Sequence, residues 1–289
     1  AGDQLLAIAG RLWGRRGEPF RGEYLQLTRS YYGAPLEALD FAGDAEGARS
    51  TINQWVAART QGKIPELLPP SLLNAGTVLV LTNAIYFKGQ WASRFDPART
   101  KQAPFKGPGA KTAAMMAQKA RLAYAEDALA QALELPYVGD RLAMVILLPK
   151  AKDGLAKLEE AVVAEGLDRW LGALAPAEVE VALPRFKIEA SFELGEPLKA
   201  LGMGVAFGSG ADFTGMSAAG GLFISAVVHK AFVEVNEEGT EAAAATGVVM
   251  TRSLPRTVRF TADHPFLFAI RDRQSGAIIF LGRLVDPGA

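Results

Sequence analysis

The sequence contains no cysteine and only two histidines, His229 and His264. Without cysteine the chain has no disulfide, no thiolate metal site and no cysteine nucleophile. Hydrolytic triads and most zinc sites need histidine, and the sequence carries no GxSxG, HExxH or Walker pattern. His229 is expected to be buried in a strand, and His264, which precedes Pro265, is expected to be exposed. We therefore predict that the protein is not an enzyme and that it has no metal site and no cofactor.

Long-range charge and long apolar runs are also absent. Lys+Arg and Asp+Glu number 31 each, so the formal net charge is zero and no strong field attracts nucleic acid or an anionic membrane. The apolar runs, such as residues 142–148, are far shorter than the roughly 20 residues of a membrane helix. No signal peptide is visible, because the first residues lack a basic start and a small-residue cleavage site. We predict neither a nucleic-acid partner nor a membrane partner.

The 289 residues, 49% of them hydrophobic, suffice for a sizeable core. Residues 77–88 are rich in β-branched and aromatic side chains, which predicts a central strand. Residues 133–137 and 142–149 predict a hairpin that turns at Gly139-Asp140. Single strands are also predicted over 179–188 and 222–235.

Two helices are predicted early in the chain. Pro19 is expected to start the first, in which Tyr24, Leu27 and Tyr31 share an apolar face, and Gly33 to end it. Asp44 is expected to cap the second helix, which ends near residue 62. Helices and strands together predict a mixed α and β domain.

The segment 237–246 does not clearly favour helix or strand. Its four consecutive alanines favour helix, whereas the β-branched and glycine residues that follow favour neither. Read as a strand, positions 240, 242, 244, 246, 248 and 250 share an uncharged face, and Glu241 lies on the other face. Composition alone favours an alanine-rich linker, but this alternation also suits a segment that slides between two strands.

The run EEGTEAAAAT at 237–246 resembles the hinge of the reactive-centre loop of the serpin family, inhibitors that trap serine proteases by inserting this loop into their main sheet. Further similarity follows in collinear order: NAIYFKGQW at 83–91, LPRFK at 183–187 and DHPFLF at 263–268. The resemblance extends from about residue 5 to the end. It implies an α+β fold with one serpin-like domain over 1–289. This fold has a large mixed main β-sheet, smaller sheets, surrounding helices and an exposed reactive-centre loop at about 237–257.

The resemblance also implies roles for the residues of the loop. Its hinge comprises Glu237, Gly239, Thr240, Glu241, Ala242, Ala243, Ala244, Ala245 and Thr246. The family's spacing, counted forward from the hinge, places the cleaved bond at Ser253-Leu254, and counted back from residue 260 it places the bond at Arg252-Ser253. Arg252 would suit a trypsin-like target protease, and Ser253 an elastase- or subtilisin-like one.

Two control points in the main sheet are implied as well. His229 would bond Asn83 beneath the centre of the sheet, where the strands must part. Glu237 would face Arg185 near Trp91 and hold the top of the sheet closed until the hinge enters. The simpler alternative is that these contacts only satisfy polar groups and have no gating role.

Two functions remain open at this point. The first is a serine protease inhibitor that acts as a suicide substrate, with residues 239–251 inserting after cleavage. The alternative is a non-inhibitory serpin-like binding or chaperone protein, whose hinge would typically carry bulky or charged residues. The small hinge residues favour the inhibitor.

The resemblance carries further expectations about the whole protein. It implies a monomer that is secreted or extracellular. Relative to the family, the chain is expected to lack the N-terminal helices, which would leave an apolar underside of the sheet exposed. Abundant Ala, Gly and Arg suggest a high-GC genome, and we expect a prokaryotic-type member.

Overall fold

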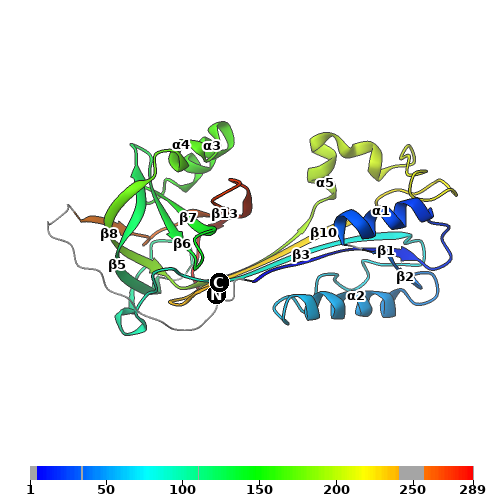
Figure 1. The fold of residues 1–289 in the computed structure, drawn as a ribbon, viewed down its shortest axis with the longest axis horizontal. Helices are drawn as coiled ribbons and strands as arrows, with labels where there is room; N and C mark the ends of the chain where they lie inside the picture. Colours follow the sequence, from blue (N-terminus) through cyan, green and yellow to red (C-terminus); the bar gives the residue numbers. More distant parts are fainter. Residues whose placement is uncertain (1–4, 34, 110, 241–256, 289) are drawn as a thin grey trace. The chain divides into compact units, whose positions relative to one another are not determined.

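The computed structural model describes residues 5–33, 35–109, 111–240 and 257–288. The chain divides into two compact units, and each is described by itself. The first consists of residues 1–5, 88–188 and 233–289, and the second of residues 6–87 and 189–232. The succession of helices and strands along the chain is shown in Figure 1.

The main sheet has the strand order β2-β1-β3-β10-β9. Its members are β1 (Leu5–Arg15), β2 (Glu37–Leu39), β3 (Leu79–Gln90), β9 (Phe186–Glu193) and β10 (Val227–Val235). β3 and β10 run parallel, from Leu81 paired with Val227 to Tyr86 paired with Phe232. The central strand predicted over 77–88 is therefore confirmed. The strand predicted over 222–235 is too long, because β10 begins only at Val227.

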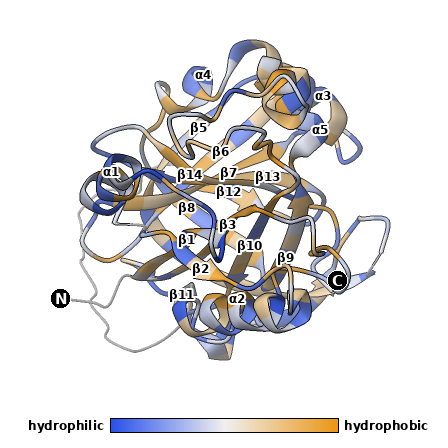
Figure 2. Cartoon of the chain, turned by 90° about the vertical axis from the view of Figure 1, so that its right-hand side faces the viewer, coloured by the Kyte–Doolittle hydropathy of each residue, from blue (hydrophilic) through white to orange (hydrophobic). Residues whose placement is uncertain are grey.

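One face of this sheet is covered by α2 (Ala45–Arg59), as Figures 1 and 2 show. The rings of Trp55 on α2 and Trp13 on β1 meet edge to face with their centroids 5.3 Å apart. The Trp13 indole donates a hydrogen bond of 3.0 Å to the Thr82 hydroxyl, so it also links β1 to β3. On the opposite face, Ile8 and Leu81 are 57% and 41% exposed.

For the two early helices, the predicted boundary residues Asp44 and Gly33 are confirmed, but the predicted packing of the first helix is not. Asp44 accepts a 2.8 Å hydrogen bond from the Gly47 amide, as expected of a cap. α1 (Gly22–Tyr32) starts later than Pro19 but ends at Gly33 as predicted. Its expected apolar face is largely uncovered, since Leu27 is 48% and Tyr31 83% exposed. Helical spacing shows that side chains share a face, but it does not show that anything covers that face.

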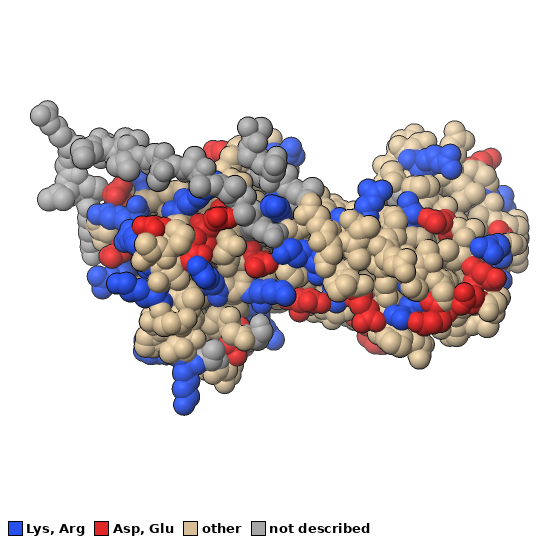
Figure 3. Space-filling model, turned by 90° about the horizontal axis from the view of Figure 1, so that it is seen from below, with Lys and Arg blue, Asp and Glu red and all other residues tan. Residues whose placement is uncertain are grey.

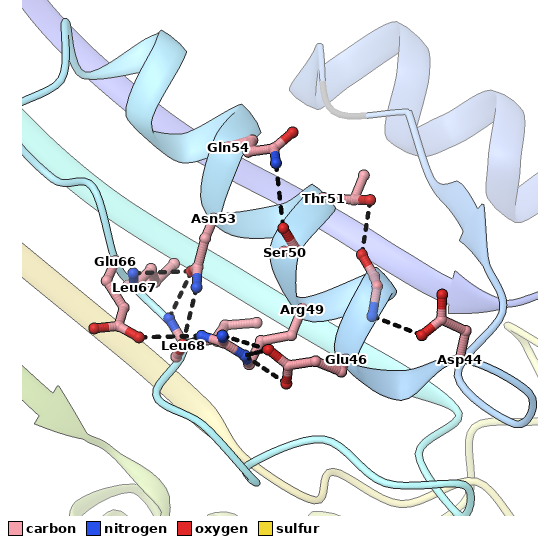
Figure 4. A network of polar contacts seen from close by, with 11 residues as sticks. Asp44, Glu46, Arg49, Ser50, Thr51, Asn53, Gln54, Glu66, Leu67 and Leu68 are labelled. Atoms are coloured by element: carbon pink, nitrogen blue, oxygen red, sulfur yellow. Dashed lines mark hydrogen bonds and ion pairs between the residues drawn. The ribbon is translucent and has the colours of Figure 1, made fainter.

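The segment that leads from α2 to β3 is fastened to the helix by side-chain hydrogen bonds (Figure 4). The Asn53 carbonyl oxygen accepts from the amides of Leu67 and Leu68 at 3.0 and 2.9 Å, and its amide donates to the Leu68 carbonyl at 2.9 Å. Arg49 Nη1 donates to the same carbonyl at 2.9 Å. Asn53 is buried, so these bonds hold the start of the segment in one position.

A second sheet lies in the unit that contains residues 88–188. Its order is β12-β8-β5-β6-β7-β13-β14, with β4 paired to β5. The strands are β4 (Lys101–Pro104), β5 (Thr112–Glu126), β6 (Ala130–Pro136), β7 (Leu142–Pro149), β8 (Ala175–Pro184), β12 (Val258–Thr261), β13 (Phe266–Asp272) and β14 (Ile278–Leu284). The predicted hairpin is confirmed as β6 and β7, with positive φ angles at Gly139 and Asp140 in the turn.

Helix α3 (Leu155–Glu165) and the short α4 (Asp168–Leu171) pack on the core around the buried Trp170. The remaining short elements are η1 (Pro97–Arg99), α5 (Gly195–Leu198), η2 (Lys199–Met203), η3 (Gly204–Phe207) and β11 (Gly239–Thr240). The single strand predicted over 179–188 is wrong. The chain there forms the end of β8 and the start of β9, in two different sheets, and it breaks at Arg185.

Candidate functional site

The side chain of Glu237 forms the centre of a buried polar cluster at the end of β10. It is 4% exposed. Arg185, from the break between β8 and β9, donates from Nε to both carboxylate oxygens at 2.8 Å, and the Thr100 hydroxyl donates to Oε1. Burial alone would raise the pKa of Glu237. The hydrogen bonds from Arg185 and Thr100 outweigh burial, so its pKa lies below its ordinary value.

Trp91 holds the backbone next to this cluster. Its indole nitrogen donates to the Asn236 carbonyl at 3.0 Å, and its own amide donates to the Glu238 carbonyl at 2.9 Å. The ring is buried and stacks on Tyr137, with centroids 4.6 Å apart and planes 11° apart. The residues that lead into the predicted hinge are thus fixed by an aromatic anchor and backbone hydrogen bonds.

Gly239 reverses the chain at this point. Its amide donates to the Asn236 carbonyl at 3.2 Å, and the Asn236 amide donates back to the Gly239 carbonyl at 3.0 Å. The φ angle of Gly239 is +132°, and a Cβ there would lie 2.2 Å from the Gly89 carbonyl oxygen. Only glycine fits both the conformation and the space.

After this turn the chain runs antiparallel to β3. Gly239 pairs with Gln90, and Thr240 with Gly89, to form β11. The other hinge residues, 241–246, and the predicted reactive bond at Arg252, Ser253 and Leu254 lie outside the described residues. The cluster around Glu237 therefore lies directly before β11, the short strand that pairs with β3.

Asn83 and His229 occupy adjacent positions in the parallel register of β3 and β10. The His229 ring is half-buried and stacks near Phe192, with centroids 6.3 Å apart. Burial lowers the pKa of His229, and a hydrogen bond with the Asn83 backbone partly opposes that shift. The expected buried pairing with the Asn83 side chain differs from this geometry, because Asn83 is exposed. The two strands are joined here by a backbone contact.

His264 was expected to be exposed, and that expectation is wrong. It is 5% exposed, with Nε2 2.7 Å from the Pro149 carbonyl oxygen and Nδ1 2.7 Å from Asp263 Oδ1. Both ring nitrogens are thus satisfied inside the second sheet. Its two hydrogen-bond partners, Asp263 and Pro149, are not members of the Glu237 cluster, so we assign His264 a structural role.

Sequence reasoning missed Thr100 and Asn236 as members of the Glu237 cluster. Thr100 lies 137 residues from Glu237 in the chain. No local pattern marks a hydroxyl that will meet a carboxylate over such a separation. Asn236 contributes its backbone carbonyl, which carries no sequence signal at all.

Other kinds of site find little support in the part of the chain that is described. Within it, no group of three or more His, Cys, Asp or Glu side chains could hold a metal ion. No described helix is both long and apolar enough to cross a membrane. Figure 3 shows basic and acidic side chains on the visible face of each unit, in keeping with the balanced charge.

Comparison with known proteins identifies the family. The sequence model for "Serpin (serine protease inhibitor)" matches residues 1–287. The leukocyte elastase inhibitor of Sus scrofa is 49% identical over 294 residues, which cover 98% of this chain and 78% of that protein. The Homo sapiens protein of the same name is 49% identical over 295 residues, with the same coverage. The chain belongs to the serpin family of serine protease inhibitors.

Solved structures agree on the fold. Uncleaved ovalbumin superposes with a TM-score of 0.89 at 35% identity, covering 99% of this chain and 75% of that one. A highly specific serpin of the insect Tenebrio molitor superposes with a TM-score of 0.87 at 34% identity, covering 98% of this chain and 76% of that one. The predicted α+β serpin fold is confirmed. These relatives are eukaryotic, and they do not support the expectations of a prokaryotic-type member and of missing N-terminal helices.

Proposed function

We propose that this protein inhibits its target serine protease as a suicide substrate. The protease would cleave the loop at Arg252-Ser253 or Ser253-Leu254, and residues 239–251 would then insert into the main sheet and trap the acyl-enzyme. The observation that carries the proposal is β11, in which Gly239 and Thr240 run antiparallel to β3. The chain thus enters beside the central strand in the direction that insertion requires.

Insertion needs a driving force beyond the new hydrogen bonds. Ordering the backbone costs about 1–2 kcal/mol per residue. Each new ladder hydrogen bond contributes roughly 1 kcal/mol net. These contributions nearly cancel, so the driving force must come from strain and poor packing of the uncleaved state. In this mechanism the protein is consumed with its target, and it acts as an inhibitor, not as an enzyme.

The type of target depends on the cleaved bond. Cleavage after Arg252 would select a trypsin-like protease, whose specificity pocket holds a buried carboxylate, and cleavage after Ser253 an elastase- or subtilisin-like one. Relatives that are named leukocyte elastase inhibitors support elastase as the first target to test. We further propose a secreted or extracellular monomer, which the family resemblance supports.

A second candidate is a non-inhibitory binding or chaperone-like protein. The exposed apolar side chains on the main sheet favour it, since Ile8 and Leu81 are 57% and 41% exposed. Such apolar surface commonly marks a site of protein association. The small, uncharged alternation of the hinge favours the inhibitor instead.

Incubation with trypsin and with elastase distinguishes the two functions. A complex that survives a denaturing gel would support the trap, and sequencing of the released C-terminal peptide would choose between Arg252 and Ser253. Complete cleavage without a complex would mean that the loop is only a substrate. The binding-protein function would then be favoured.

A further inference from the structure

A cavity of about 360 Å³ lies in the unit formed by residues 6–87 and 189–232, apart from the Glu237 cluster. Its walls include Leu68 and Leu73 from the segment that leads to β3, together with Val80 and Val228 from the sheet. All four side chains are buried. Phe223, which is 51% exposed, stands at its margin.

The fold explains why a cavity forms here. Pairing between β3 and β10 begins at Leu81 and Val227, so Val80 and Ala226 flank an opening one residue earlier. The covering segment cannot collapse into this opening, because Asn53 fastens its start to α2 (Figure 4). The cavity therefore has fixed walls on two sides, one formed by the sheet and the other by the covering segment.

The lining defines the chemistry of a ligand. None of the residues around the cavity is charged, and its polar side chains are Asn74, Thr77 and Ser225. Thr77 Oγ1 accepts from the Asn74 amide at 3.1 Å, and Asn74 Oδ1 from the Gly76 amide at 2.9 Å. Among the described residues, no hydrogen bond engages Asn74 Nδ2 or Ser225 Oγ. The volume lies in the usual range of small-molecule sites, about 300–1,000 Å³.

We propose that this cavity binds an uncharged, largely apolar small molecule with one hydrogen-bonding group, and that the bound molecule opposes loop insertion. The apolar body contacts Leu73, Val80 and Phe223, and the polar group meets Ser225 or Asn74 at the mouth. A charged ligand is disfavoured, since no side chain in the lining would compensate its lost hydration.

The effect on insertion rests on the proposed function. Gly239 pairs with Gln90 and Thr240 with Gly89, in antiparallel register. In an inserted strand that continued this register along β3, residue 249 would lie opposite Val80, which lines the cavity. A molecule held there blocks the last part of the inserting segment. The inhibitor would then be cleaved before the protease is trapped.

N-phenyl-1-naphthylamine is a suitable probe, because it is uncharged, has one N–H group and fluoresces in apolar surroundings. Binding is measured by titration against the wild type and three variants. Ala226→Phe fills the cavity and Phe223→Ser removes part of its wall. Phe192→Ser is the matched control, since Phe192 is 50% exposed and does not line the cavity.

Saturable binding to the wild type and to Phe192→Ser, weakened about tenfold or more in both cavity variants, supports the site. Equal binding to all four proteins overturns it, because the probe would then occupy the exposed sheet face. Circular dichroism establishes that each variant is folded. The half-exposed positions of residues 223 and 226 make the two cavity substitutions tolerable.

A second measurement tests regulation separately from inhibition. Covalent complex with elastase or trypsin is quantified with and without saturating probe. A several-fold lower yield of complex in the wild type, but not in Phe223→Ser, which weakens binding without filling the cavity, supports the regulatory effect. An unchanged yield overturns it. If no complex forms even without probe, the proposed function fails, while the titration still decides whether the ligand site exists.

Discussion

Arg185 and Glu237, 52 residues apart in the chain, form a forked ion pair with Arg185 Nε 2.8 Å from each carboxylate oxygen. The Glu237 side chain is 5% exposed and that of Arg185 48%. The carboxylate is therefore held inside the protein while its cation reaches the surface. Such a pair is worth more than an exposed one, because water screens it less.

Replacing Glu237 by Gln should destabilise the folded state at neutral pH by about 1–3 kcal/mol. The pKa of Glu237 is lowered in the folded protein, so its ionised form favours folding. That stabilisation is complete above its ordinary value of 4.5 and is lost as the pH falls through the lower folded-state pKa. Urea unfolding of wild type and Glu237→Gln between pH 3 and 7 should show a difference that shrinks toward acid pH.

Glu238→Gln is the control for that series, because Glu238 is the half-exposed neighbour. It should change the free energy of unfolding by less than about 0.5 kcal/mol. A pH-independent difference between wild type and Glu237→Gln would show that the carboxylate charge does not stabilise the cluster.

Gly239→Ala should disrupt the turn that starts β11. The alanine Cβ would meet the Gly89 carbonyl at 2.2 Å, and its φ of +132° is one that L residues rarely adopt. We expect a loss of about 1–3 kcal/mol in the free energy of unfolding, measured in urea. Gly215→Ala is the control, since nothing lies within 4 Å of its Cβ and its φ is not in that region. Equal stability of the two variants would mean that the turn relaxes at no cost.

The sequence predicted regular elements well wherever local chemistry decided them. Asp44 and Gly33 act as helix boundaries because a side-chain cap and a positive φ are local requirements. The hairpin turn at Gly139-Asp140 is local in the same sense. By contrast, the burial of His264 depends on Pro149, 115 residues away. No property of the residues beside His264 could have indicated that contact.

The same limit applies to the candidate site. The pairing of Arg185 with Glu237 was predicted because the family resemblance implies it. Neither residue shows a local pattern that would have indicated the other. The exposure of Asn83 was not foreseen, since burial depends on what covers the sheet and not on the strand itself. The break at Arg185 was missed because residues 175–193 are strand-like throughout and only the tertiary fold divides them.

Loss of an apolar side chain should destabilise the protein much more at Val80 than at the adjacent Leu81 of β3. Val80 is 5% exposed and Leu81 is 41% exposed on the other face. Val80→Ser should cost about 2–3 kcal/mol, whereas Leu81→Ser should cost less than about 1 kcal/mol and reduce aggregation. Thermal unfolding and light scattering measure the two effects. Equal aggregation of Leu81→Ser and the wild type would show that the protein does not aggregate through this face of the sheet.

The alternation of the hinge gives the sharpest test of trapping. In an inserted strand that continued the register of β11 along β3, Ala243 would lie opposite Tyr86, which is 1% exposed, and Ala244 would lie on the other face, which carries Leu81 at 41% exposed. Ala243→Arg should therefore place a charge on the buried face of the sheet, which costs several kcal/mol without a partner, and the loop should be cleaved before it inserts. The moles of inhibitor consumed per protease should rise about tenfold or more for Ala243→Arg and stay near the wild-type value for Ala244→Arg. If both variants trapped the protease equally well, or if both lost trapping, the assignment of Ala243 to the buried face would be wrong.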